Sequence, residues 1–159
     1  MTIIHLLGID PGLVDTGAVL FQFETSRHSL QTSARRFDGG DATEIAEWVA
    51  SLSPQPITFI ERYRDRGTVF TTHNAMRNLE MQLREAIPGA TLLDNSGVKR
   101  IVTKDLMVAL GVWKFDILTN HQDLRSAARI ALLGALRVPE LNQVITEHLI
   151  ALLDQEVTK

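Results

Sequence analysis

The stretch that most constrains the fold is an apolar run over residues 3–9, which ends in a carboxylate at Asp10 and is broken by Pro11-Gly12. A nearly unbroken apolar run of this length is typical of a strand that is buried on both faces. The apolar pattern resumes over residues 17–21, after a gap too short for a crossover helix, so the two strands are expected to form an antiparallel hairpin. Asp10 is therefore predicted at the tip of a rigid central strand, where ligands bind in open α/β sheets.

A second strand that ends in a carboxylate is predicted over residues 57–60, which are followed directly by Glu61. An amphipathic helix precedes it, and Asp41 has the spacing of a cap for that helix. A connection through a helix is long enough to bring the new strand back parallel to the first one. Because neighbouring parallel strands end at the same edge of a sheet, we expect Asp10 and Glu61 to lie close together.

The rest of the pattern predicts a mixed sheet that is covered by helices. Residues 29–37 would complete an antiparallel meander with the opening hairpin, and residues 90–93 would add a further short strand. Thr103 is expected to cap one helix, and Thr119 or Asn120 another. Helices are predicted over residues 70–87, 96–102, 103–110, 121–136 and from about 139 to 154. With no internal repeat or linker, residues 1–159 are expected to form one α/β domain with a mixed five-stranded sheet.

The chain has no cysteine, which excludes disulfides, thiolate metal sites and thiol nucleophiles. No segment has the character of a signal peptide or a membrane span, so a cytoplasmic protein without membrane contact is expected. The net charge of −3 gives no indication of nucleic-acid binding. Positive charge is nevertheless clustered, so a basic face is compatible with the acidic total. The two clusters are Arg62, Arg64 and Arg66, and Lys99, Arg100 and Lys104.

A third acidic residue, Asp123, lies in the first exposed turn of the helix predicted over residues 121–136. Each of Asp10, Glu61 and Asp123 alone is more often a solvated surface group or a helix cap, but their shared position relative to the sheet makes the set informative. Carboxylate oxygens with open positions suit Mg²⁺ or Mn²⁺ rather than zinc. A pair of such ions, about 4 Å apart, can activate water and stabilise the leaving oxygen in phosphodiester hydrolysis.

Four short motifs follow one another along the chain. They are Gly8-Ile9-Asp10-Pro11-Gly12 with Thr16-Gly17, Phe59-Ile60-Glu61, Val98-Lys99-Arg100-Ile101-Val102-Thr103, and Ser126-Ala127-Ala128-Arg129-Ile130-Ala131-Leu132. Their order resembles that of the RuvC Holliday-junction resolvases of the RNase H-like superfamily, over residues 3–136. The resemblance implies an RNase H-like fold and a homodimer that cuts two opposed strands of a four-way DNA junction. It also implies that Asp10, Glu61 and Asp123 are metal-binding catalytic acids, and that Lys99 contacts a phosphate or the transition state.

The resemblance further implies two Mg²⁺ ions in each active site, which Mn²⁺ can replace. Tyr63 or Phe70, beside the second motif, would stack on unpaired bases near the crossover. The helix over residues 70–87 is expected to form the dimer interface through Met76, Leu79 and Leu83. Compact divergent relatives of this kind are often phage-encoded, in which case the host cytoplasm is the expected location. The residues expected to contact DNA are Arg62, Tyr63, Arg64, Phe70, Lys99, Arg100 and Lys104.

Three departures from the family pattern leave part of the site open. The family's last helix presents two metal ligands three residues apart, and the best apolar phasing here pairs Asp123 with Ser126. Sliding the match by one turn pairs Asn120 with Asp123 instead, and His121 is a further candidate ligand. The glycine-rich loop that follows Val-Thr in the family is missing, because Thr103 enters the next helix directly. The last departure is the helix after Pro139, which extends past the resemblance.

Other functions fit parts of this pattern. A sugar kinase or an actin-like ATPase shares the opening hairpin but needs a second domain, for which 159 residues leave no room. The sequence hardly distinguishes a junction-cutting nuclease from a nuclease of the same superfamily that acts on RNA. A catalytically inactive junction-binding module is favoured by Ser126 and opposed by the intact Asp10 and Glu61. The sequence therefore predicts a metal-dependent endonuclease for four-way and other branched DNA, with the RNA nuclease and the inactive module as alternatives.

Overall fold

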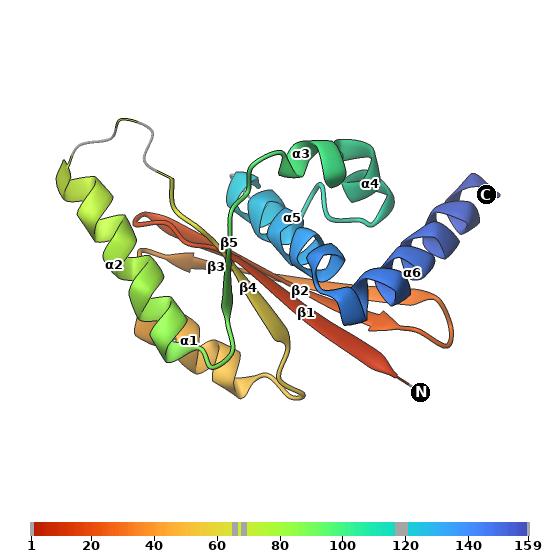
Figure 1. Ribbon diagram of the computed structural model, residues 1–159, viewed down its shortest axis with the longest axis horizontal. Helices are drawn as coiled ribbons and strands as arrows, with labels where there is room; N and C mark the ends of the chain where they lie inside the picture. Colours follow the sequence, from red (N-terminus) through yellow and green to blue (C-terminus); the bar gives the residue numbers. More distant parts are fainter. Residues whose placement is uncertain (1, 65–66, 68–69, 117–120, 159) are drawn as a thin grey trace.

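A five-stranded mixed sheet forms the middle layer of the computed structural model (Figure 1). The structure describes residues 2–64, 67, 70–116 and 121–158, apart from the side chains of Phe70 and Glu156. The strands are β1 (Ile3–Asp10), β2 (Asp15–Glu24), β3 (Ser29–Asp38), β4 (Ile57–Glu61) and β5 (Thr91–Leu93). Their order is β3-β2-β1-β4-β5; β2 is antiparallel to both of its neighbours, whereas β1, β4 and β5 are parallel. The predicted meander followed by parallel strands is confirmed.

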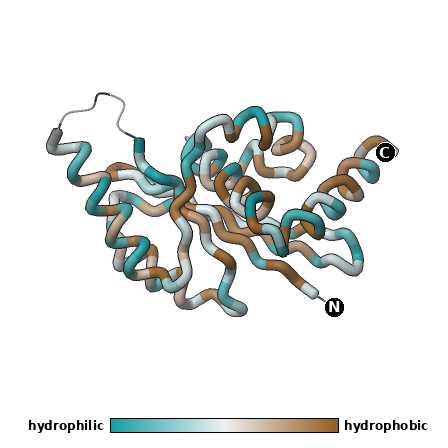
Figure 2. The backbone as a smooth tube through the Cα atoms, viewed as in Figure 1, coloured by the Kyte–Doolittle hydropathy of each residue, from teal (hydrophilic) through white to brown (hydrophobic). Residues whose placement is uncertain are grey.

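Helices cover both faces of this sheet (Figure 1). They are α1 (Ala42–Ser51), α2 (Phe70–Ala86), α3 (Val98–Ile101), α4 (Lys104–Ala109), α5 (Gln122–Arg137) and α6 (Pro139–Val157). α1 and α2 pack on one face around Ile9 and Ile45, and α5 packs on the other face around Leu6 and Ile130, together with α3, α4 and α6. Figure 2 shows hydrophobic segments along the central strands and over α5. Alternation along β1 explains this division, because successive side chains of a strand point to opposite faces.

Two residues expected at a dimer interface belong to the core of the chain instead. Leu79 and Leu83 of α2 are 3% and 0% exposed and pack against the sheet in the same cluster as Leu7 and Ile60. The prediction that they contact a second copy is therefore wrong, because the sheet already covers the apolar stripe of α2. Met81, on the outer side of α2, is 53% exposed.

Two glycines allow α5 to pack directly on β1 and β2. A Cβ atom on Gly8 would lie 1.9 Å from the carbonyl oxygen of Ala127, and one on Gly17 would lie 2.6 Å from the carbonyl carbon of Asp123. Neither distance admits a side chain, so the backbone of α5 rests on the backbone of the strands. Because Gly17 pairs with Asp10 in the sheet, this close approach holds the first turn of α5 beside the tip of β1.

The helix starts follow the expected capping chemistry in two of three cases. The Asp41 carboxylate accepts hydrogen bonds from the backbone N–H groups of Thr43 and Glu44, and the Thr103 hydroxyl accepts one from Leu106. At the start of α5, His121 occupies the cap position without a side-chain capping bond. The predicted caps Thr119 and Asn120 lie outside the described residues. Within the described part of the chain, no helix combines the length and hydropathy needed to cross a membrane.

Candidate active site

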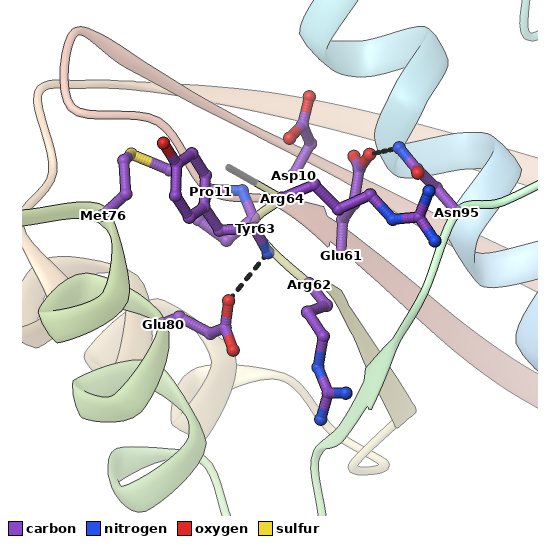
Figure 3. A pocket seen from close by; sticks show the side chains of 9 residues that line it. All are labelled: Asp10, Pro11, Glu61, Arg62, Tyr63, Arg64, Met76, Glu80 and Asn95. Atoms are coloured by element: carbon purple, nitrogen blue, oxygen red, sulfur yellow. Dashed lines mark hydrogen bonds between the residues drawn. The ribbon is translucent and has the colours of Figure 1, made fainter. Parts of the chain in front are cut away.

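Asp10 and Glu61 lie side by side at the ends of two parallel strands (Figure 3). The register pairs Ile9 of β1 with Ile60 of β4, so the residues that follow end both strands at the same edge of the sheet. The two carboxylates are close enough for the charge of Glu61 to raise the pKa of Asp10. The prediction that these carboxylates meet follows from strand register alone, and the structure has this register.

The environment of Asp10 is poor in positive charge. Burial raises the pKa of Asp10 to about 9, and the negative charges of Glu61 and Asp123 contribute to the increase. The Ser126 hydroxyl acts in the opposite direction. Ser126 of α5 therefore lies near Asp10, as its place one turn after Asp123 allows. A buried carboxylate beside a second carboxylate favours the binding of a proton or a cation.

Asn95 is a site residue that the sequence analysis missed. Its side-chain amide donates a hydrogen bond to Glu61 Oε1 (Figure 3). Asn95 follows β5 by two residues, so it stands at the end of the third parallel strand, just as Asp10 and Glu61 end the first two. The rule that identified the two acids would have found Asn95 if it had been applied to the short strand at residues 90–93.

A cavity of about 230 Å³ opens beside the two acids (Figure 3). Its wall includes Glu80 of α2, which was not predicted to take part in any site, and Met76, which was expected at the dimer interface. The Glu80 carboxylate accepts a hydrogen bond from the backbone N–H of Tyr63, at 2.7 Å. This bond holds the segment after β4 against α2 and so shapes the cavity mouth. The lining residues are Asp10, Pro11, Glu61, Arg62, Tyr63, Arg64, Met76, Glu80 and Asn95.

Asp123 has a different environment from the other two acids. Asp10 pairs with Gly17 across β1 and β2, and Gly17 pairs with Arg36 across β2 and β3, so the three residues form one row on the α5 face. Asp123 sits over Gly17 and thus lies between Asp10 and Arg36. The Arg36 guanidinium forms an ion pair with Asp15. Burial and the Asp15 charge raise the pKa of Asp123, and Arg36 opposes this rise.

The remaining candidate ligands and basic residues are distributed around this centre. His121 accepts a hydrogen bond at Nδ1 from the backbone N–H of Phe115, at 2.9 Å. This nitrogen is therefore already bonded to the backbone of the segment that precedes α5. Lys99 and Arg100 are exposed on α3, which begins three residues after Asn95. Lys104 is also exposed, with its ammonium 4.9 Å from the centre of the Trp113 ring. Asn120, the alternative partner of Asp123, lies outside the described residues.

The residues after β4 are partly engaged with their neighbours. Arg64 forms an ion pair with Asp94, whose pKa is lowered to about 2 by the bond from Arg64 and by the backbone N–H of Ser96. The Tyr63 ring meets the His73 ring edge to face, with centroids 5.4 Å apart. In Figure 3 the Arg62 side chain extends away from Asp10 and Glu61. The Phe70 side chain and Arg66 lie outside what the structure describes.

The donor set fits a hard divalent cation. Among the described residues, no group of three or more His, Cys, Asp or Glu side chains is placed to hold a metal ion together. Asp10 and Glu61 nevertheless offer adjacent carboxylate oxygens, and no basic side chain is among the groups that shift the pKa of Asp10. Mg²⁺ is commonly held by one or two carboxylates, with waters and substrate phosphates as its other ligands. The chemistry of the pair matches that of such a site, and Asp123 lies near enough for its charge to act on Asp10.

The strand order and the two helical layers define an RNase H-like fold. RuvC from T. thermophilus, in complex with a Holliday junction substrate, superposes with a TM-score of 0.60 over 87% of this chain and 97% of that one, at 13% identity. The chain is therefore RuvC-like in fold.

Two further solved structures match with lower scores. A second Thermus thermophilus RuvC structure has a TM-score of 0.47 and 16% identity, over 82% of this chain and 91% of that one. The Fowlpox virus resolvase with its Holliday junction DNA has a TM-score of 0.43 and 10% identity, over 84% and 96% of the two chains. No protein-family model matches the sequence, and no curated protein matches it at a significant level.

Proposed function

We propose that this chain is a divalent-metal-dependent endonuclease that cuts four-way and other branched DNA by phosphodiester hydrolysis. The observation that carries the proposal is the pair of adjacent, half-buried carboxylates, Asp10 and Glu61, at the tips of β1 and β4. The RuvC-like fold supports the same activity, because a RuvC in complex with a Holliday junction substrate has a similar fold.

Asp10 and Glu61 would hold the cation, with Asn95 orienting Glu61 and the Ser126 hydroxyl orienting Asp10. Bound Mg²⁺, or Mn²⁺ in its place, would activate the attacking water and stabilise the leaving oxygen. Asp123 belongs to the proposed active site as a third acid, next to the pair. If two ions are bound, Asp123 is the acid available for the second one.

The DNA would approach across the edge of the sheet where the cavity opens. Lys99 on α3 would contact the phosphate at the cut, and Arg100 and Lys104 would contact phosphates beside it. Tyr63 is half-buried at the cavity mouth and would stack on an unpaired base. A homodimer is proposed because two opposed strands of a junction must be cut from two sites. Its interface does not include Leu79 and Leu83, which are buried within one chain.

The test is a side-by-side cleavage assay on a four-way junction, a flap, a linear duplex and an RNA–DNA hybrid, with Mg²⁺ and with EDTA. We expect cleavage of the junction and the flap only when Mg²⁺ is present. Cleavage of the hybrid in preference to the junction would support the RNA nuclease. Binding of the junction without cleavage in Mg²⁺ or Mn²⁺ would support the inactive module, for which Ser126 in place of a carboxylate is the specific observation.

A further inference from the structure

A second cavity, of about 510 Å³, adjoins the candidate active site along the outer side of α2. It shares Arg62, Tyr63 and Glu80 with the 230 Å³ cavity beside Asp10, so the two form a continuous depression. We call this second cavity the arginine groove. The residues that define it are Arg62, Tyr63, Arg77, Glu80, Met81 and Arg84.

The arginine groove is strongly positive on a protein whose net charge is −3. Its three guanidinium groups come from Arg62, Arg77 and Arg84, and within the described residues none of them forms an ion pair with a carboxylate. Glu80 is the acid among the lining residues, and its carboxylate accepts the Tyr63 N–H. The nearby Glu85 lines a different cavity, beside Asp41. Of the two acids of α2, Glu80 therefore lies in the groove and Glu85 lies outside it.

The spacing of the basic residues matches an extended polyanion. Arg77, Met81 and Arg84 stand at helical positions i, i+4 and i+7, so they share one face of α2. A helix rises about 1.5 Å per residue, which places Arg77 and Arg84 about 10 Å apart along the axis. Duplex DNA carries about one phosphate charge per 1.7 Å of its axis, so a stretch of that length presents several phosphates to two arginines.

The direction of Arg62 links the groove to the active site. Its side chain extends away from Asp10 and Glu61 (Figure 3), and Arg62 lines the arginine groove together with Arg77 and Arg84. Met81, 53% exposed, adds an apolar surface between Arg77 and Arg84 on which a sugar could rest. We propose that the arginine groove binds the phosphate backbone of a DNA arm that leaves the active site. The choice of DNA as the ligand rests on the proposed function.

The first test is the salt dependence of junction binding by the full chain carrying Arg77→Gln and Arg84→Gln. The matched control carries Arg27→Gln and Arg137→Gln, which remove the same charge from the β2–β3 turn and the end of α5. Each lost phosphate contact lowers the slope of log K against log salt by about 0.9 unit. We expect the groove variant to lose close to two such units and the control to keep the wild-type slope. The control should also keep the wild-type rate of cleavage, because neither Arg27 nor Arg137 lines the cavity beside Asp10 or the arginine groove.

The second test uses the absence of cysteine from the chain. Met81→Cys introduces a single thiol in the groove, and Ile150→Cys introduces one on α6 at nearly the same exposure, since Met81 and Ile150 are 53% and 54% exposed. Each variant is incubated with junction DNA that carries a bromoacetamide group at successive backbone positions of one arm. We expect Met81→Cys to cross-link at positions away from the crossover, and Ile150→Cys not to cross-link.

Three outcomes decide the proposal. Equal slopes for the groove variant and the control, or equal cross-linking by the two cysteine variants, would overturn it. A change in oligomeric mass of the groove variant, measured by light scattering without DNA, would also overturn it, because the groove would then be a contact between copies. If the wild-type protein cuts no DNA but the slope and cross-link results hold, the proposed nuclease function fails while the arginine groove stands as a DNA-binding surface.

Discussion

The acids of the candidate site fall into two regions that differ in what surrounds their charge. At the strand tips, burial and the charges of two other acids raise the pKa of Asp10, which the Ser126 hydroxyl opposes. Glu61 there accepts a hydrogen bond from the neutral Asn95 amide. Across the row on the α5 face, Asp123 lies near Arg36, which is itself paired with Asp15. The strand-tip pair is short of positive charge, whereas Asp123 has a cation of the protein beside it.

Because of this difference, a bound metal ion should stabilise the two regions to different extents. A half-buried pair of adjacent carboxylates gains most from an external cation, because without one the two charges repel each other or one carboxylate must bind a proton. Asp123 gains less, since Arg36 already offsets part of its charge. We therefore expect cleavage to depend most steeply on the strand-tip pair, and the following experiments test that ranking.

The largest effect is expected for Asp10→Asn. This change keeps the shape of the side chain and removes the charge that would hold the cation, so the cleavage rate should fall by at least about a thousandfold, or about 4 kcal/mol of transition-state stabilisation. Junction binding in EDTA should be retained, because neutralising a buried acid does not weaken the attraction for phosphates. Cleavage at the wild-type rate would show that the active site lies elsewhere.

Asp123→Asn should have a smaller effect on the same assay. If Arg36 offsets part of the charge of Asp123, the cleavage rate should fall by about tenfold to a hundredfold. This loss corresponds to about 1.4–2.7 kcal/mol of transition-state stabilisation. The comparison with Asp10→Asn is made at several Mg²⁺ concentrations, since weaker ion binding is partly restored by more ion. A loss as deep as that of Asp10→Asn at every concentration would remove the distinction between the two regions.

Gly17→Ala should move the first turn of α5, which carries Asp123, away from the strand tips. The added Cβ would meet the backbone of Asp123 at 2.6 Å, so the first turn of α5 must lift from β2. Overpacking of this kind costs about 1–3 kcal/mol of the free energy of unfolding. Urea denaturation measures this loss, with Ser33→Ala on the exposed side of β3 as the control. A stability equal to that of the control would mean that α5 is not held against the strand at this point.

The smallest effect is expected for Arg36→Gln. Without the guanidinium, Asp15 and Asp123 lose a shared cation, and a bound divalent ion becomes the remaining way to offset their charge. Mn²⁺ binding, measured by isothermal titration calorimetry without DNA, should tighten a few-fold. Arg35→Gln on the same strand is the matched control, since Arg35 pairs with Glu44 at an exposed position. Weaker Mn²⁺ binding by Arg36→Gln would instead show that Arg36 holds Asp123 in a ligating position.

Much of the frame was predictable from the sequence because it depends on local patterns. The apolar runs before Asp10 and Glu61 indicate buried strands, and the length of each connection separates hairpin from crossover. These two facts place both acids at one edge of the sheet, as the register shows. The caps at Asp41 and Thr103 are equally local, since they depend on backbone N–H groups within three residues.

What the tertiary structure decided is which side chains meet across elements that are distant in the chain. The pairing of Arg36 with Asp15 depends on the register of β2 with β3. The position of Asp123 depends on Gly17, which has no side chain to keep α5 away from β2. From the sequence, Leu79 and Leu83 fit an interface and a core equally well, because an apolar stripe does not specify what covers it. The sequence by itself determined where the strands end and which charges they present. The packing of α5 and α2 determined how each charge is neutralised, since electrostatic energies depend on distances that only the folded chain sets.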